Sequence, residues 1–229
     1  MPPQLRETLR TRKTSDMQTN GQEPRTSKDV GTTLATLQSF IGQPPSEPQI
    51  QAYLSSLSTT PLDGETKSYS DASYVNYHAL GISLCCIQKK GTPGGNMVVE
   101  SVDLYNPRPT VAVPGRRSRK REWERFKGLP LSIPAQPDTT GSQPLLLDSS
   151  TTGAALVSTL GEPTRKGGGT GWVDVWLEYA SLGLQIDLQD PRGDEVVSEE
   201  EQKKGMGGVW DRAGRWIWSS CKVFEPTGP

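Results

Sequence analysis

Several short stretches of the chain alternate between apolar and polar residues, which is the pattern of β-strands that bury one face. Residues 172–179 (WVDVWLEY) place one set of apolar side chains on a single face of an extended chain: Val173, Val175, Leu177 and Tyr179. Residues 182–188 (LGLQIDL) do the same with Leu182, Leu184, Ile186 and Leu188. The sequence ASLG joins the two stretches, so we predict a β-hairpin with one buried face.

The same pattern occurs twice along the chain. Three blocks match in the same order in both halves: 51–57 with 154–160, 74–84 with 176–186, and 98–107 with 217–226. Three ordered matches indicate an internal repeat. A competing match, 32–44 with 151–163, leaves the start of the first repeat open.

Each repeat begins with a predicted helix and continues as strands. Ser46 is a candidate N-cap of the first helix, with Pro48 in its first turn. Residues 149–152 offer caps for the second helix, and Gly161 is its predicted end. We therefore predict an α+β fold of two tandem units, each with a helix on the apolar face of an antiparallel sheet. The two sheets are either separate or joined edge to edge into one.

The domain organisation follows from this repeat. Residues 1–30 have almost no large apolar side chains, so we predict a disordered N-terminal tail. The remaining boundaries are a first α+β repeat at 31–107, a basic and Pro-rich connection at 108–144, and a second α+β repeat at 145–229. The second repeat carries a predicted acidic hairpin insertion at 189–208.

Composition limits the cellular compartments and the classes of binding partner that we expect. The 229 residues have a formal net charge of −1, which provides no bulk attraction to nucleic acid or to an anionic membrane. The three cysteines have no disulfide-framework spacing, which is typical of a reduced, intracellular protein, cytoplasmic or nuclear. No apolar run approaches the roughly 20 residues that a membrane span needs.

The sequence contains little catalytic or metal-binding chemistry. Residues 165–169 (RKGGG) follow a predicted helix, whereas a phosphate loop precedes one, so we interpret them as a turn. His78 is the only histidine, and no serine stands in a G-x-S-x-G motif. We predict no catalytic residue, no metal site and no cofactor. A hydrolase with an unrecognised carboxylate pair remains an alternative.

A basic segment lies in the predicted connection between the repeats. Its charged residues are Arg116, Arg117, Arg119, Lys120 and Arg121. Such a run is typical of a nuclear import signal or a nucleic-acid-binding patch. A mobile charged linker is the favoured interpretation, with Trp123 and Phe126 as candidate anchors on the fold. A nuclear or nucleic-acid-associated protein is therefore an alternative function.

Aromatic residues at strand positions facing away from the apolar rows form the main candidate site. By strict alternation they are Trp172, Trp176, Trp216, Trp218 and Phe224 in the second repeat, with Tyr74 and Tyr105 in the first. Aromatic side chains among charged ones are typical of a protein-binding surface. We therefore predict a non-catalytic interaction or inhibitor-like module with a protein partner. The competing interpretation is that the chain's own loops cover these residues.

Several segments also resemble known proteins. FIGQPPSEPQIQAYLSSL (40–57), YVNYHALGISL (74–84), ESVDLYN (100–106), LGEPTRKGGG (160–169) and WDRAGRW (210–216) resemble uncharacterised fungal proteins. More distantly they are similar to bacterial proteins with a late LGEP sequence. The tandem helix-plus-sheet plan resembles that of the beta-lactamase inhibitor proteins. These resemblances imply an architecture and assign no functional residue.

Overall fold

In the computed structural model, the described residues are 31–89, 96–108, 122–135, 143–168, 175–189 and 205–228. They belong to one compact unit that spans residues 31–229. The predicted tail at 1–30 and most of the predicted acidic insertion lie outside the described residues.

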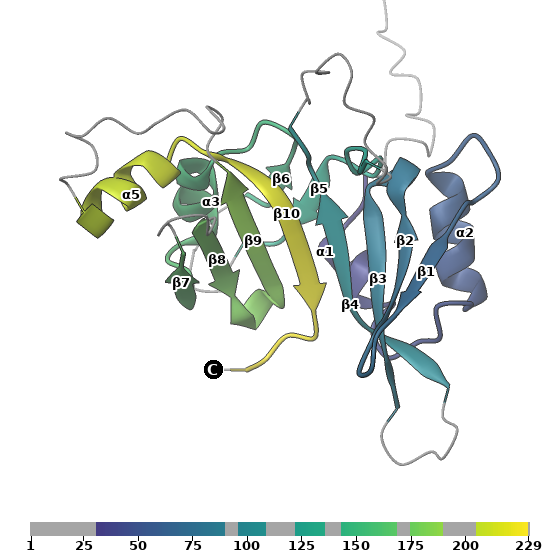
Figure 1. The fold of residues 1–229 in the computed structure, drawn as a ribbon. Coiled ribbons are helices and arrows are strands. Elements are labelled where there is room, and N and C mark those ends of the chain that lie inside the picture. Colours follow the sequence, from purple (N-terminus) through teal and green to yellow (C-terminus); the bar gives the residue numbers. More distant parts are fainter. Residues whose placement is uncertain are drawn as a thin grey trace, which may run out of the picture. The chain divides into compact units, whose positions relative to one another are not determined.

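An eight-stranded antiparallel sheet is the centre of the fold (Figure 1). Its strand order is β1-β2-β3-β4-β10-β9-β8-β7. The strands of the first half are β1 (Glu65–Ser68), β2 (Ser73–Tyr77), β3 (Ile82–Gln88) and β4 (Met97–Tyr105). Those of the second half are β7 (Arg165–Gly167), β8 (Val175–Tyr179), β9 (Leu184–Gln189) and β10 (Ile217–Phe224). The α+β class is confirmed, and β4 pairs with β10 to make one continuous sheet.

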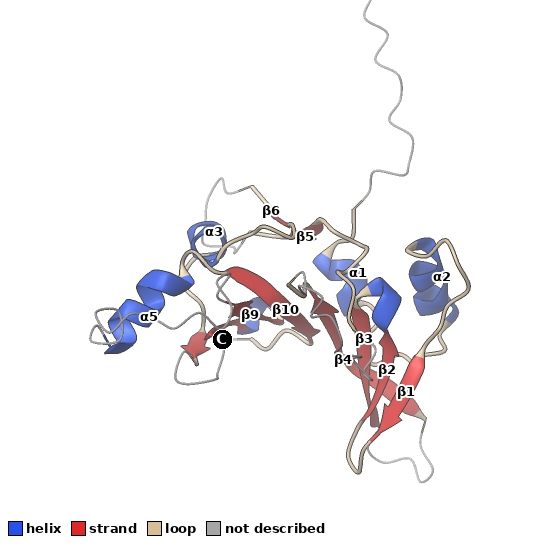
Figure 2. Cartoon of the chain, turned by 45° about the horizontal axis from the view of Figure 1, so that its top comes forward, coloured by secondary structure: helices blue, strands red, loops and turns tan. Residues whose placement is uncertain are grey.

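The described helices lie on one side of this sheet (Figures 1 and 2). They are α1 (Leu34–Gln38), α2 (Pro48–Ser56), α3 (Gly153–Leu160) and α5 (Gly205–Ala213). A small sheet of β5 (Leu131–Ile133) and β6 (Leu145–Leu147) belongs to the same layer and buries alternate side chains. The hydrophobic core lies between this layer and the sheet. Among the described helices, none is both long and apolar enough to cross a membrane.

The two halves have the same strand topology. In each, a hairpin is closed by one turn of 3-10 helix, η1 (His78–Leu80) between β2 and β3 and η2 (Ala180–Leu182) between β8 and β9. Gly81 and Gly183 follow these turns with φ of +66° and +62°, a left-handed conformation that favours glycine. The ASLG hairpin predicted from alternation is therefore present, and the first half contains its counterpart.

The helix caps identify the matching helices. Thr33 caps α1 by accepting a hydrogen bond from the Thr36 amide, and Thr152 caps α3 in the same way. The alignment of 32–44 with 151–163 therefore describes the structure better than the alignment of 51–57 with 154–160. The helix α2 is an addition to the first half. Its N-cap is Glu47 without a side-chain hydrogen bond, so the prediction of Ser46 as the cap was wrong.

Two β-bulges occur at equivalent places in the sheet. Between β3 and β4 the register shifts so that Glu100 is the extra residue, and between β9 and β10 Ser219 is the extra residue. A bulge shifts the alternation by one. Where strict alternation gives the correct face for the side chains after the bulge, it therefore gives the wrong face for those before it. In the second half, the final residues of the predicted hairpin insertion instead begin helix α5.

Candidate functional site

The sheet face opposite the helices, which we call the open face, carries a continuous polar row. One residue from each of the eight strands is in register with the next: Glu65, Asn76, Ser83, Asp103, Lys222, Gln185, Glu178 and Arg165. At the usual spacing of about 4.8 Å between strands, this row spans roughly 34 Å. Within this row Asn76, Ser83 and Asp103 are buried, whereas Lys222 and Arg165 are exposed. The part of the row that a partner can reach therefore lies mainly in the second half.

Four partly buried aromatic side chains lie on the open face, on either side of the polar row. They are Tyr74 on β2, Tyr105 on β4, Trp176 on β8 and Phe224 on β10. Tyr74 and Trp176 are equivalent in the alignment of 74–84 with 176–186. Tyr105 and Phe224 are equivalent in the alignment of 98–107 with 217–226. The structure thus brings two related pairs of predicted aromatic residues onto one face.

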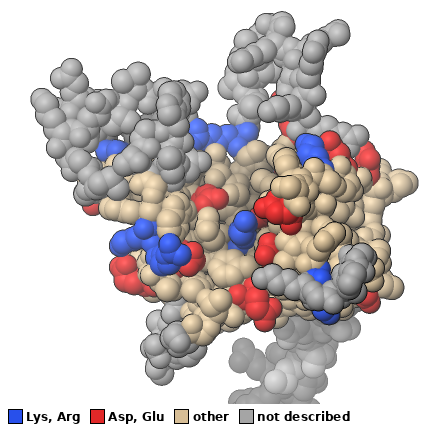
Figure 3. Space-filling model, turned by 60° about the horizontal axis from the view of Figure 1, so that its bottom comes forward, with Lys and Arg blue, Asp and Glu red and all other residues tan. Residues whose placement is uncertain are grey.

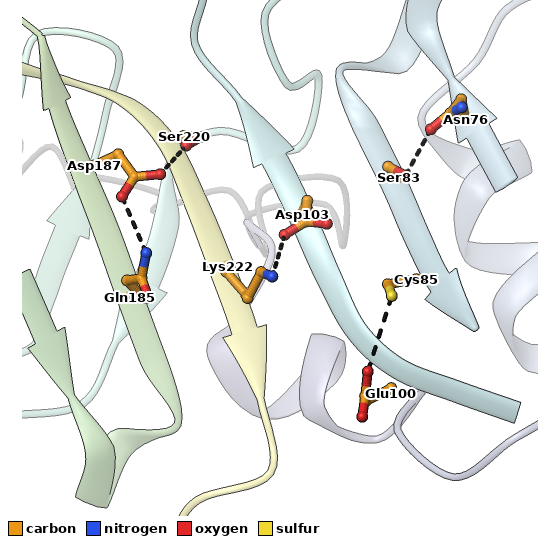
Figure 4. A network of polar contacts seen from close by, with 9 residues as sticks. All are labelled: Asn76, Ser83, Cys85, Glu100, Asp103, Gln185, Asp187, Ser220 and Lys222. Atoms are coloured by element: carbon orange, nitrogen blue, oxygen red, sulfur yellow. Dashed lines mark hydrogen bonds and ion pairs between the residues drawn. The ribbon is translucent and has the colours of Figure 1, made fainter. Parts of the chain in front are cut away.

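Asp103 and Lys222 form the centre of the face. They are paired across β4 and β10, with Lys222 Nζ 3.9 Å from Asp103 Oδ1 (Figure 4). The two residues are also equivalent in the repeat alignment, so the approximate two-fold axis relating the halves passes between them. Asp103 is 9% exposed, and burial raises its pKa while Lys222 acts in the opposite direction.

Neighbouring polar groups on this face are mostly engaged with one another (Figure 4). Ser83 donates a 2.7 Å hydrogen bond to Asn76 Oδ1 on the first-half side. On the second-half side, Asp187 accepts hydrogen bonds from Ser220 at 2.6 Å and from Gln185 at 3.1 Å. These contacts fix the side chains in place, so the surface is largely preorganised.

An aromatic stack covers one end of the face in the first half. Trp123 stacks on Tyr105 with ring centroids 3.9 Å apart and lies 4.1 Å from the His78 ring. His78 Nε2 lies 3.0 Å from Glu65 Oε2, and this hydrogen bond lowers the pKa of Glu65. The prediction that Trp123 and Phe126 anchor the connection is consistent with this geometry, since Phe126 is buried in the core.

The indole ring of Trp176 lies against β7, the edge strand of the sheet in the second half. A Cβ added at Gly167 would come within 2.6 Å of the indole Cζ2, so the ring lies against the glycine backbone of β7. The Arg165 guanidinium is 5.9 Å from the ring, within the range of a cation–π contact. Glycine and arginine on the edge strand therefore orient this indole. Residues 165–167 form a strand, so their interpretation as a turn was wrong.

The thiol and phenol groups of the face are held in their protonated forms. Burial raises the pKa of the Cys85 thiol, and a hydrogen bond with that thiol raises the pKa of Tyr74 to about 12. A protonated thiol is a poor nucleophile. Within the described ranges, no three His, Cys, Asp or Glu side chains come together as a metal site would require.

Two of the predicted aromatic residues are not on the open face. Trp218 is 0% exposed in the core, and its indole N–H donates a 2.6 Å hydrogen bond to the Asp148 carbonyl. Trp216 is partly buried against the same core. The bulge at Ser219 causes both errors, because the residues before it alternate out of phase with Lys222 and Phe224. Val99, the counterpart of Trp218 in the first half, lies just before the bulge at Glu100 and is also buried.

Other predicted residues lie outside the described part of the chain. Trp172 is one of them, and the basic residues at 116–121 are the others. Acidic and basic side chains of the described residues are interspersed on the face that Figure 3 displays. A role for the basic segment stays a prediction.

Sequence reasoning missed the Asp103–Lys222 pair, although its signal was present. When two copies of a strand pair antiparallel about a two-fold axis, the residue at the axis lies opposite its own counterpart. The alignment of 98–107 with 217–226 already made Asp103 the counterpart of Lys222. What it could not show was that β4 and β10 are the strands that meet.

Comparison of the chain with models of protein families, with curated proteins and with solved structures finds no match. The residues of the open face are therefore the basis for any functional conclusion. The resemblance to fungal and bacterial proteins stays a prediction.

Proposed function

We propose that this chain is a non-catalytic protein-binding module that contacts its partner through the open face. The observation that supports this proposal is the set of four aromatic side chains, in two related pairs, around the Asp103–Lys222 ion pair. Aromatic side chains contribute much of the binding free energy at protein interfaces, and they do so where water is excluded.

The width of the face supports a macromolecular partner. The polar row crosses all eight strands, and the aromatic residues are distributed over both halves. An ordinary solvated sheet face is the competing explanation, because antiparallel sheets commonly leave one face to water. The large, partly exposed aromatic side chains favour the binding role.

The partner we propose is asymmetric. Equivalent positions in the two halves carry different chemistry: Asp103 and Lys222 at the axis, Cys85 and Asp187 beside it, and Asn76 and Glu178 further out. A partner with two-fold symmetry would meet two different surfaces here. A single protein with one distinct contact for each half fits the arrangement better.

The test is affinity capture from a lysate of the native organism with tagged wild-type chain and single variants. Trp176→Ala and Phe224→Ala should each reduce recovery of the partner by about 30-fold, the equivalent of roughly 2 kcal/mol at a hot spot. Leu146→Ala is the matched control, because Leu146 is an exposed apolar residue on β6, in the helix layer. Circular dichroism melting would show that each variant is folded.

The outcomes separate the proposal from its competitors. Unchanged recovery with both aromatic variants would mean that the open face is a plain solvated surface. Recovery that depends on intact nucleic acid, shown by loss after nuclease treatment of the lysate, would favour the nucleic-acid alternative. Equal loss with Leu146→Ala would place the interface elsewhere.

A further inference from the structure

A cavity lies on the helix side of the sheet in the second half, away from the open face. Its volume is about 210 Å³, and it is a partly open pocket between α3, α5 and the core-facing side of β8 and β9, with the exposed residues Ala154, Glu162 and Lys166 in its lining. The apolar lining includes Ala154, Val157, Leu177, Leu188, Trp210 and Ala213. Two charged residues, Glu162 and Lys166, also line it.

The second half has no helix equivalent to α2 among its described elements, and the cavity lies on the side of the sheet where α2 lies in the first half. In the first half, α2 follows α1 and lies alongside β1 and β2 on the helix side (Figures 1 and 2). In the second half, α3 ends at Gly161 and the chain enters β7 within a few residues. The helix α5 covers this area from the other direction, and space remains between it and α3.

Close packing fixes one end of the cavity. The amide of Ala154 donates a 2.8 Å hydrogen bond to the Gly214 carbonyl, and the amide of Gly153 donates a 2.9 Å bond to the Trp216 carbonyl. A Cβ at Gly153 would come within 2.4 Å of the Ala213 carbonyl oxygen, so only glycine permits this approach. The wall formed by α3 and the end of α5 is therefore preformed.

The charged groups of the lining neutralise one another. Lys166 Nζ lies 3.5 Å from Glu162 Oε2, and the lysine side chain is 50% exposed. The same ammonium lies 5.4 Å from the Trp210 ring centroid. An ion pair at a wet position leaves no net charge to attract an anion or a cation, whereas the apolar walls favour a ligand without charge.

We propose that this cavity binds a small uncharged aromatic compound of about the size of indole. A closed apolar cavity of about 150 Å³ accepts benzene, and this larger, partly open pocket of about 210 Å³ has room for a somewhat larger ring system with one edge toward water. The Trp210 ring forms one wall against which a planar ligand would stack. This site is independent of the open face and of the protein-binding role proposed for it.

The probe is indole, titrated into the full chain and followed by calorimetry and by methyl NMR. We expect saturable binding with shifts confined to the methyl groups of the lining residues, such as Val157, Leu177 and Leu188. Indole-3-acetate and tryptamine, the anionic and cationic analogues, should bind at least threefold more weakly. A charged analogue that binds tenfold more tightly than indole would overturn the assignment of an uncharged ligand.

Variants that fill the cavity complete the test. Ala154→Leu should weaken indole binding at least tenfold, because Ala154 is an exposed helix residue with its side chain at the cavity. Val157→Phe fills the same space from the next turn of α3 and serves if Ala154→Leu does not fold. Ala52→Leu, at an exposed position of α2, is the matched control and should leave the affinity unchanged. Absence of saturable binding, or equal weakening by the control, would overturn the proposal.

Discussion

The two halves of the sheet share their strand geometry and differ in what surrounds it. Both have the hairpin closed by a 3-10 turn, the positive-φ glycine after it, and a β-bulge at the equivalent place. In the first half, α2 covers the helix side and Trp123 covers an aromatic residue of the open face. In the second half, α5 and a cavity occupy the helix side. The strands of the sheet are thus common to both halves, while the connections between the strands make the two halves different.

The largest expected effect comes from the residues just before the two bulges, which test whether β4 and β10 have the same geometry. Trp218 in β10 and Val99 in β4 are equivalent, and both are buried just before the bulge. We expect Trp218→Ala to lower the free energy of unfolding by about 3–5 kcal/mol, because a large cavity remains and the Asp148 carbonyl loses its donor. Val99→Ala should cost roughly 2 kcal/mol at the same site of the first half. Urea unfolding measures both, and a loss under about 1 kcal/mol for Trp218→Ala would contradict its position in the core.

Substitution of the glycine after each 3-10 turn tests whether the surrounding chain restricts the two turns equally. An added Cβ would lie 2.4 Å from the Phe126 amide nitrogen at Gly81 and 2.2 Å from the Phe224 carbonyl oxygen at Gly183. Gly81→Ala and Gly183→Ala should each cost roughly 2–4 kcal/mol, from the left-handed backbone and the clash together. Gly42 also has positive φ but has nothing within 4 Å, so Gly42→Ala isolates the backbone contribution of about 1–2 kcal/mol. Thermal unfolding that shows equal losses for all three variants would mean that the clashes are relieved by small movements.

The charge pair at the two-fold axis distinguishes the halves chemically. Lys222→Asp places two carboxylates opposite each other, so we expect a loss of roughly 1–2 kcal/mol in unfolding free energy. The double variant Asp103→Lys, Lys222→Asp restores an ion pair with reversed polarity and should recover most of that stability. If the partner distinguishes the two halves, the double variant should be stable and still lose partner capture. Recovery of both stability and capture would show that polarity at the axis does not contribute to recognition.

A good part of the fold follows from local sequence pattern. Alternation placed Val175, Leu177 and Tyr179 in the core and Trp176 on the open face, and these positions are confirmed. Capping preferences placed the start of the second helix at one of residues 149–152 and its end at Gly161, and the structure has Thr152 and Gly161 as the two caps. The alignment of the two hairpins was also visible, because the turn between their strands needs glycine at one position.

Long-range pairing decided the rest. Whether Trp218 faces the core depends on the register between β9 and β10, where Ser219 is accommodated as a bulge. Alternation counts residues along one strand and contains no information about the residue opposite, so it assigned Trp216 and Trp218 to the wrong face. The edge strand β7 is three residues long, too short for alternation to indicate, and it forms by pairing with β8.

The sequence by itself determined which residues of each hairpin are apolar, where the hairpins turn, and which strands of the two halves correspond. Those properties depend on backbone conformation and on burial over a few residues. Only the tertiary structure decided that β4 meets β10, and that meeting places Asp103 opposite Lys222 and assembles four aromatic side chains on one face. The pairing joins residues more than 100 positions apart, and its free energy comes from a core shared by both halves, which no local pattern of residues contains.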